Sequence, residues 1–143
     1  MPDLSGLSAL ICGASEGIGR ATAIELGNCG AQITALARNP ERLQTLKEHL
    51  PNTARFTAIA VDLNDHTTLL SKLAQIDQHY DILICNSGGP RPSKLISTSE
   101  EDFAFAIHQH LATSHLLARK CLPSMKEQQY GRIINILSTS LYL

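Results

Sequence analysis

The stretch Gly13-Ala14-Ser15-Glu16-Gly17-Ile18-Gly19 decides the fold; it follows the apolar run Ala9-Leu10-Ile11-Cys12 and precedes a helical pattern at 20–27. A strand, a glycine-rich turn and a helix in this order direct free backbone N–H groups at one point. Glycine there permits a sharp turn, a close approach to a pyrophosphate and tight packing of helix on sheet. The turn predicts a phosphate site, with a tight turn lacking a ligand as the alternative. It is no P-loop, because no Gly-Lys-Ser/Thr follows.

The rest of the chain alternates between apolar runs and helical patterns. Further strands are expected at 33–37, 56–61, 82–85 and 133–137, with helices between them. Strands that are apolar on both faces and separated by helices indicate a parallel sheet covered on both sides. The expected fold is therefore α/β, a doubly wound parallel sheet that binds ligands at the carboxyl ends of its strands. No linker or repeat interrupts the chain, so we expect one domain over 1–143.

Local signals predict where the helices begin and which sides they bury. Asn39 and Pro40 are typical of a helix start, and Pro51 of its end. Thr98 and Glu101 form a capping box for a long helix over 98–129. Helical spacing predicts three buried apolar sides: Leu43, Leu46 and Leu50; Leu69, Leu70, Leu73 and Ile76; and Phe103, Ile107, Leu111, Leu117, Cys121 and Met125.

Composition excludes several classes of protein. The chain has 143 residues, 43% hydrophobic, with a formal net charge of −1, which argues against disorder and against nucleic acid as a partner. No apolar run reaches the roughly 20 residues of a membrane span, and the start has no signal-peptide pattern, so we expect no membrane partner and a cytoplasmic location. The cysteines and histidines lack metal-ligand spacing, so no metal site is expected, and the four cysteines are interpreted as packed, reduced thiols.

The spacing Gly-x-x-x-Gly-x-Gly resembles that of the short-chain dehydrogenase/reductase family, and within it the 3-oxoacyl-carrier-protein reductases and their relatives. Further blocks match the family in order along the chain: Leu4-Ser5-Gly6, Asp62-Leu63, Cys85-Asn86-Ser87-Gly88, Leu122-Pro123-Ser124-Met125 and Gly131-Arg132-Ile133-Ile134-Asn135. The resemblance implies a Rossmann fold truncated after the fifth strand and therefore incomplete at its C-terminus. It also implies a nucleotide cofactor bound by Gly13, Ser15, Glu16, Gly17, Ile18, Gly19, Arg38, Asp62, Leu63, Asn86, Ser87 and Gly88.

The residues after the second strand predict which nucleotide binds. An acid there hydrogen-bonds a free ribose 2′-hydroxyl, whereas an arginine accommodates a 2′-phosphate. Ala37 stands where the acid would be and Arg38 follows it, so we predict NADP(H). The missing acid also disfavours an S-adenosylmethionine methyltransferase. A solvated surface charge is the alternative for Arg38, and Glu16 stands where many NADP-preferring relatives carry a second basic residue.

The resemblance also implies catalytic positions. Ser138 falls on the family's serine, with Ser140 as the second choice, and His110 stands at the asparagine that anchors a water on the long helix. A packed, non-catalytic histidine is the alternative for His110. The family's tyrosine and lysine come about a dozen residues after the serine, beyond Leu143, so no acid/base residue is assigned. The loop 89–92 with Arg91 is expected to border the substrate pocket.

The resemblance implies an oxidoreductase that transfers hydride between NADP(H) and a small carbonyl or alcohol substrate, with at most trace activity in the 143-residue form. A non-catalytic NADP(H)-binding protein or a subunit of a mixed oligomer is the alternative, and a self-associating remnant is a third. In the family the long helix over 98–129 belongs to a subunit interface, so a homo-oligomer, a dimer or tetramer, is expected.

Overall fold

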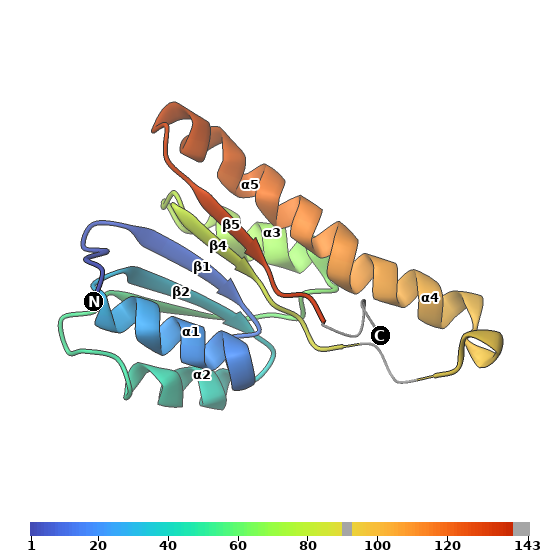
Figure 1. Ribbon diagram of the computed structural model, residues 1–143. Helices are drawn as coiled ribbons and strands as arrows, with labels where there is room; N and C mark the ends of the chain where they lie inside the picture. The colour runs from blue at the N-terminus through green and yellow to red at the C-terminus, as the bar shows by residue number, and fades with distance from the viewer. Residues whose placement is uncertain (90–92, 139–143) are drawn as a thin grey trace.

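The computed structural model describes residues 1–89 and 93–138. Within them the chain forms a five-stranded sheet of parallel pairs in the order β3-β2-β1-β4-β5 (Figure 1). The strands are β1 (Ser8–Cys12), β2 (Gln32–Ala37), β3 (Phe56–Ala60), β4 (Ile82–Cys85) and β5 (Arg132–Asn135). The order reverses between β1 and β4, which confirms the doubly wound arrangement and puts the expected ligand crevice at the ends of these two strands.

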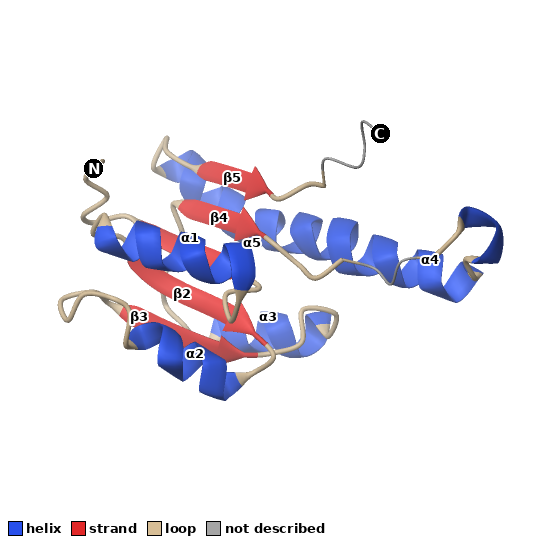
Figure 2. Cartoon of the chain, turned by 60° about the horizontal axis from the view of Figure 1, so that its bottom comes forward, coloured by secondary structure: helices blue, strands red, loops and turns tan. Residues whose placement is uncertain are grey.

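Helices cover both faces of the sheet (Figure 2). On one face α1 (Gly17–Asn28) and α2 (Pro40–Lys47) pack on alternate strand residues such as Ala9 and Ile11. On the other face α3 (His66–Ala74) and α5 (Thr113–Glu127) pack on the intervening ones, such as Leu10. Because strand side chains alternate between faces, one apolar strand supplies both cores.

Helix starts follow local hydrogen-bond chemistry. Asn39 caps α2 as predicted, since its Oδ1 accepts from the Arg42 N–H at 2.9 Å. The cap of α4 (Glu100–Ala106) is Ser99, whose Oγ accepts from the Asp102 N–H at 3.0 Å, so the prediction of Thr98 is wrong. The Thr98 hydroxyl instead donates to the Lys94 carbonyl at 3.0 Å, across the short turn η1 (Leu95–Ser97).

The expected long helix is α4, a π-helical segment η2 (Ile107–Ala112) and α5 in succession. Leu117, Cys121 and Met125 are buried as predicted. The predicted burial of three others is wrong: Phe103 is 62% exposed, Leu111 is 65% exposed and Ile107 is also exposed. Phe103 lies on α4, which in Figure 1 extends past the carboxyl ends of the strands with no sheet beneath it, whereas Ile107 and Leu111 lie on η2.

Some element limits and one buried position also differ from expectation. Helix α2 ends at Lys47, although Leu50 beyond it is buried, and β3 ends at Ala60. Leu70 on α3 is exposed. Strand β5 covers Arg132–Asn135 and not 133–137, because its pairing stops with Cys85, the last residue of β4.

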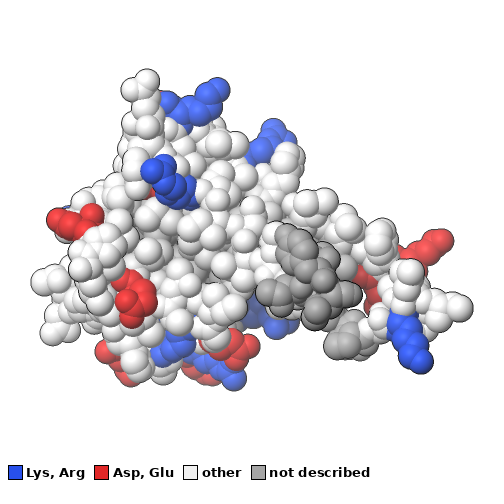
Figure 3. All heavy atoms as spheres, viewed as in Figure 1, with Lys and Arg blue, Asp and Glu red and all other residues white. Residues whose placement is uncertain are grey.

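Strand β5 is also exposed along its whole length, so the expectation of cover on both faces fails there. Figure 3 shows few charged side chains in the middle of the face over which β5 runs in Figure 1. Arg91 and Ser140 lie outside the described residues. In the part of the chain that the structure describes, no helix has the length and apolar character to cross a membrane, and no metal-ligand cluster occurs.

Candidate functional site

The glycine turn after β1 is built on close backbone contacts. Gly13 has φ +62° and Gly17 has φ +55°, in the left-handed region that favours glycine. A Cβ on Gly19 would lie 2.2 Å from the Gly13 carbonyl oxygen, and one on Gly13 would lie 2.6 Å from the Asn86 carbonyl oxygen. The turn therefore folds on itself and against the loop after β4 only because these residues lack side chains.

The N-terminus of α1 presents N–H groups that no side chain caps. Its N-cap residue, Glu16, makes no side-chain capping bond, whereas Asn39, Asp65 and Ser99 cap the following three α-helices. The space above Gly17 is open. Uncapped N–H groups, the helix dipole and an open glycine suit the phosphates of a dinucleotide, so the residues present fit such a cofactor.

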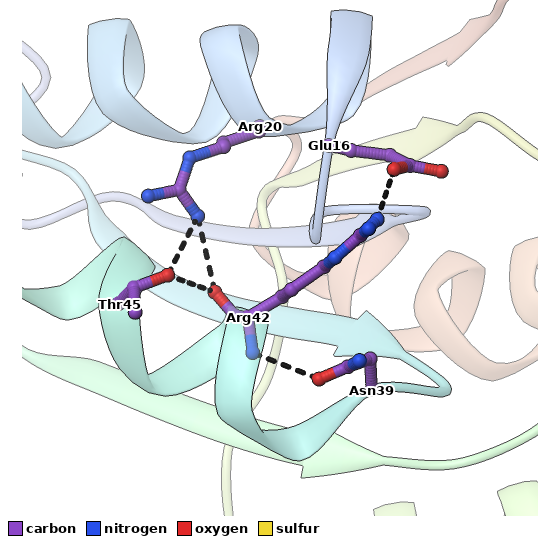
Figure 4. Close-up of polar contacts among 5 residues, drawn as sticks. All are labelled: Glu16, Arg20, Asn39, Arg42 and Thr45. Atoms are coloured by element: carbon purple, nitrogen blue, oxygen red, sulfur yellow. Dashed lines mark hydrogen bonds and ion pairs between the residues drawn. The ribbon is translucent and has the colours of Figure 1, made fainter.

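The loop after β2 and the first turn of α2 carry the basic residues of the site. Arg38 follows β2 and is exposed. The guanidinium of Arg42, on α2, forms an ion pair with the Glu16 carboxylate across the glycine turn (Figure 4). Sequence reasoning missed Arg42, because the two residues are 26 positions apart and meet only when α2 packs beside α1.

The loops after β3 and β4 are both held by η2. The Nε2–H of His108 donates to the Asn64 carbonyl at 2.9 Å, next to the expected residues Asp62 and Leu63. The next residue, Gln109, donates from Nε2 to the Gly88 carbonyl at 3.1 Å. His110, the third successive residue of η2, contacts Ser87 in the loop after β4, so three neighbouring side chains bind two strand-end loops. Such π-helical turns are frequent at functional sites.

His110 is half-buried, and its Nδ1 lies 2.7 Å from Ser87 Oγ, within hydrogen-bond distance. Its Nε2 is buried with no hydrogen-bond partner among the described residues. Beside it, Leu63, Asn86, Ser87, Gln109 and Thr113 line a small pocket with the ends of β1 and β4. The structure thus brings expected residues of the loops after β3 and β4 to one place, and the unpartnered ring nitrogen of His110, which contacts Ser87, suits a water or a ligand atom.

Two further histidine contacts stiffen this region. The rings of His66 and His108 stack with centroids 4.1 Å apart. His66 Nε2 lies 2.9 Å from the hydroxyl of Thr113, and this hydroxyl lies within hydrogen-bond distance of the Leu63 and His108 carbonyls. Desolvation, and then the nearby His108, lower the pKa of His66.

The remaining expected site residues are Asp62, Ser15, Ile18 and Ser138. Asp62 is exposed and accepts from the Asn64 N–H at 2.9 Å, while Ser15 and Ile18 lie in or beside the glycine turn. Ser138 is exposed and follows β5. Because β5 runs parallel to β4, Ser138 lies on the side of the sheet where the carboxyl ends of both strands are. Burial raises the pKa of the Cys85 thiol and raises that of Cys121 to about 11, which fits packed thiols rather than reactive ones.

This strand order and glycine turn define a doubly wound α/β protein, a fold class in which this turn is typical of dinucleotide sites. The chain belongs to the short chain dehydrogenase family, whose sequence profile matches residues 8–141. It is 37% identical over 138 residues to 3-oxoacyl-[acyl-carrier-protein] reductase FabG of Rickettsia bellii, covering 96% of this chain and 56% of that protein. The chain therefore spans about half the length of the curated relatives it matches.

Solved structures agree with this assignment. A 3-oxoacyl (acyl-carrier-protein) reductase from Agrobacterium tumefaciens C58 with NADP bound superposes with a TM-score of 0.81 at 26% identity, over 96% of this chain and 54% of that one. L-Sorbose reductase from Gluconobacter frateurii, complexed with NADPH and L-sorbose, gives a TM-score of 0.81 at 28% identity, over 93% and 52%.

Proposed function

We propose that this chain forms a single NADP(H)-binding domain, 1–143, of an oxidoreductase that transfers hydride between the nicotinamide and a carbonyl or alcohol substrate. The observation that carries the proposal is the uncapped N-terminus of α1 over an open glycine turn, at the point where the strand order reverses. The names of two solved relatives, which include NADP and NADPH, support the choice of cofactor.

Each part of the site has a role in binding. The backbone of the glycine turn and the first turn of α1 would hold the pyrophosphate, and Arg38 the ribose 2′-phosphate. The Asp62-Leu63 segment would contact the adenine, and Asn86, Ser87 and Gly88 the far side of the crevice. When bound, the cofactor supplies the hydride or accepts it.

The proton side of the reaction would involve His110 and Ser138. Ser87 fixes the ring of His110 through Nδ1, which leaves Nε2 to orient a water or the substrate oxygen. Ser138 would hydrogen-bond the substrate oxygen. No Tyr-x-x-x-Lys pair follows Ser138 in the sequence, so we expect nucleotide binding with at most trace turnover from the 143 residues alone.

Titration calorimetry of the purified chain with NADPH and NADH tests this proposal. We expect NADPH to bind more tightly, and Arg38→Ala to lower NADPH affinity about tenfold by removing a charge-assisted contact. Tighter binding of NADH, or unchanged NADPH affinity in the variant, would contradict the choice of cofactor. Sustained turnover by the intact chain would contradict the expectation of trace activity.

A subunit of a larger assembly is the second candidate, favoured by one observation. Every residue of β5 is exposed, and so are the apolar side chains Phe103 and Phe105 of α4. Exposed apolar surface and an unpaired strand edge are typical of surfaces that another chain covers. Oligomer formation measured by sedimentation would support this candidate, and a strict monomer would contradict it.

A further inference from the structure

The Glu16–Arg42 ion pair lies at the rim of the proposed nucleotide site. The side chain of Arg42 is 55% exposed and that of Glu16 is 72% exposed. Exposed pairs of this kind contribute little to folding stability. The position of the pair is more informative, because Glu16 is the N-cap residue of α1 and Arg42 is in the first turn of α2, four residues beyond Arg38.

The backbone around Arg42 is fixed from two sides, which limits where its guanidinium can go. Its N–H donates to Asn39 Oδ1 at 2.9 Å, and its carbonyl accepts from Arg20 at 3.0 Å (Figure 4). Arg20 also donates to the hydroxyl of Thr45, so α1 and α2 are joined beside the pair. In Figure 4 the side chain of Arg42 extends away from these contacts toward Glu16.

A carboxylate at this rim opposes a 2′-phosphate unless it is neutralised. The phosphate carries close to two negative charges, and Glu16 adds a third at the first residue before the helix. A guanidinium has five N–H donors in a planar fork and can contact a carboxylate and a phosphate together. Arg42 thus removes the repulsion and adds a donor.

We propose that Arg42 is a specificity-determining residue that binds the ribose 2′-phosphate of NADP(H) beside Arg38, and that Glu16 is the positioning residue that holds it there. The inference rests on the proposed nucleotide site and adds to it a second basic residue. It also gives a role to Glu16, which stands where many NADP-preferring relatives carry a basic residue.

This arrangement predicts the direction in which each substitution changes the NADPH affinity. Arg42→Gln removes a donor to the phosphate and leaves Glu16 unneutralised, so NADPH affinity falls about tenfold or more. NADH lacks the 2′-phosphate, so its affinity stays within about twofold. Adding Glu16→Gln to Arg42→Gln removes the repulsion and restores part of the lost NADPH affinity, a non-additive result that a merely structural arginine would not give.

Calorimetric titration of the wild type and these variants with NADPH and NADH tests the proposal. Arg119→Gln is the matched control, because it removes the same charge from an exposed residue of α5, on the other face of the sheet, and keeps the Arg42 guanidinium and its contacts. We expect it to leave the ratio of NADPH to NADH affinity unchanged, with circular dichroism confirming that every variant is folded.

The possible results separate two kinds of failure. If the wild type binds NADPH and Arg42→Gln leaves the ratio of NADPH to NADH affinity unchanged, the role of Arg42 is refuted and the proposed function stands. If additivity holds between the two changes, the positioning role of Glu16 is refuted. If the folded wild type binds neither nucleotide, the proposed function itself fails.

Discussion

Strands β4 and β5 are neighbours of similar apolar character, yet their environments are opposite. Ile84 and Ile134 are partners in the ladder, but Ile84 is 2% exposed and Ile134 is 47% exposed. Every residue of β4 is buried and every residue of β5 is exposed. The comparison teaches that an apolar run predicts a strand, whereas its burial depends on what lies on its other side.

The largest expected effect tests this difference directly. Ile84→Ala removes a fully packed side chain and should lower the free energy of unfolding by about 3 kcal/mol. Ile134→Ala, the matched change one strand away, should lower it by less than about 1 kcal/mol, because the side chain is already half in water. Urea denaturation measures both, and equal losses would mean that β5 is covered in solution.

A second contrast extends the comparison to glycines. Gly19→Ala places a Cβ against the Gly13 carbonyl oxygen and should cost about 2 kcal/mol of unfolding free energy. Gly89→Ala is the control, since nothing lies within 4 Å of its added Cβ, and it should change stability by less than about 0.5 kcal/mol. Equal urea midpoints for the two variants would show that the glycine turn is not tightly packed.

A smaller effect is expected where β4 ends. Ser87→Ala leaves both ring nitrogens of His110 without a partner among the described residues, which should cost about 1 kcal/mol. Ser93→Ala, in an exposed loop, is the control and should be neutral. Thermal melting compares the two, and an unchanged melting temperature for Ser87→Ala would mean that the Ser87–His110 contact adds nothing.

The smallest effect is a pH dependence at His66. Its pKa is lowered in the folded chain, mainly by desolvation and then by His108, against a smaller opposing effect of Asp65. The neutral form is therefore favoured on folding. The stability it contributes is present above the usual pKa near 6.5 and is lost as pH falls through the lower folded pKa.

Urea midpoints of the wild type should accordingly fall between pH 7 and pH 5, beyond any fall in a His66→Gln variant that cannot titrate there. His49→Gln is a control, because His49 is an exposed residue on the far side of the sheet from η2. An identical fall in the wild type and His66→Gln would remove His66 from the explanation.

The sequence was sufficient where the structure depends on neighbours along the chain. Asn39 was identified as a cap from its own chemistry and the proline after it. The sequence could not decide whether Thr98 or Ser99 caps α4, because each has an acidic residue three positions later, Glu101 and Asp102. The course of the chain through η1 decides between them.

Long-range features of the site escaped prediction for a related reason. Leu111 and Leu117 lie on one expected apolar stripe, but Leu117 is buried and Leu111 is exposed. The π-helical turn of η2 has no composition signal that single residues reveal. The Glu16–Arg42 contact requires two helices to be placed before its residues can be paired.

The hydrogen bonds from η2 to the loops after β3 and β4 have a thermodynamic consequence. His108 and Gln109 hydrogen-bond the loops after β3 and β4 to a helix whose other end, α4, exposes Phe103 and Phe105. Any binding event on α4 that shifts η2 changes the free energy of both loops. Linkage is reciprocal, so a ligand held by the loops would alter by the same factor the affinity of α4 for any partner whose binding shifted η2.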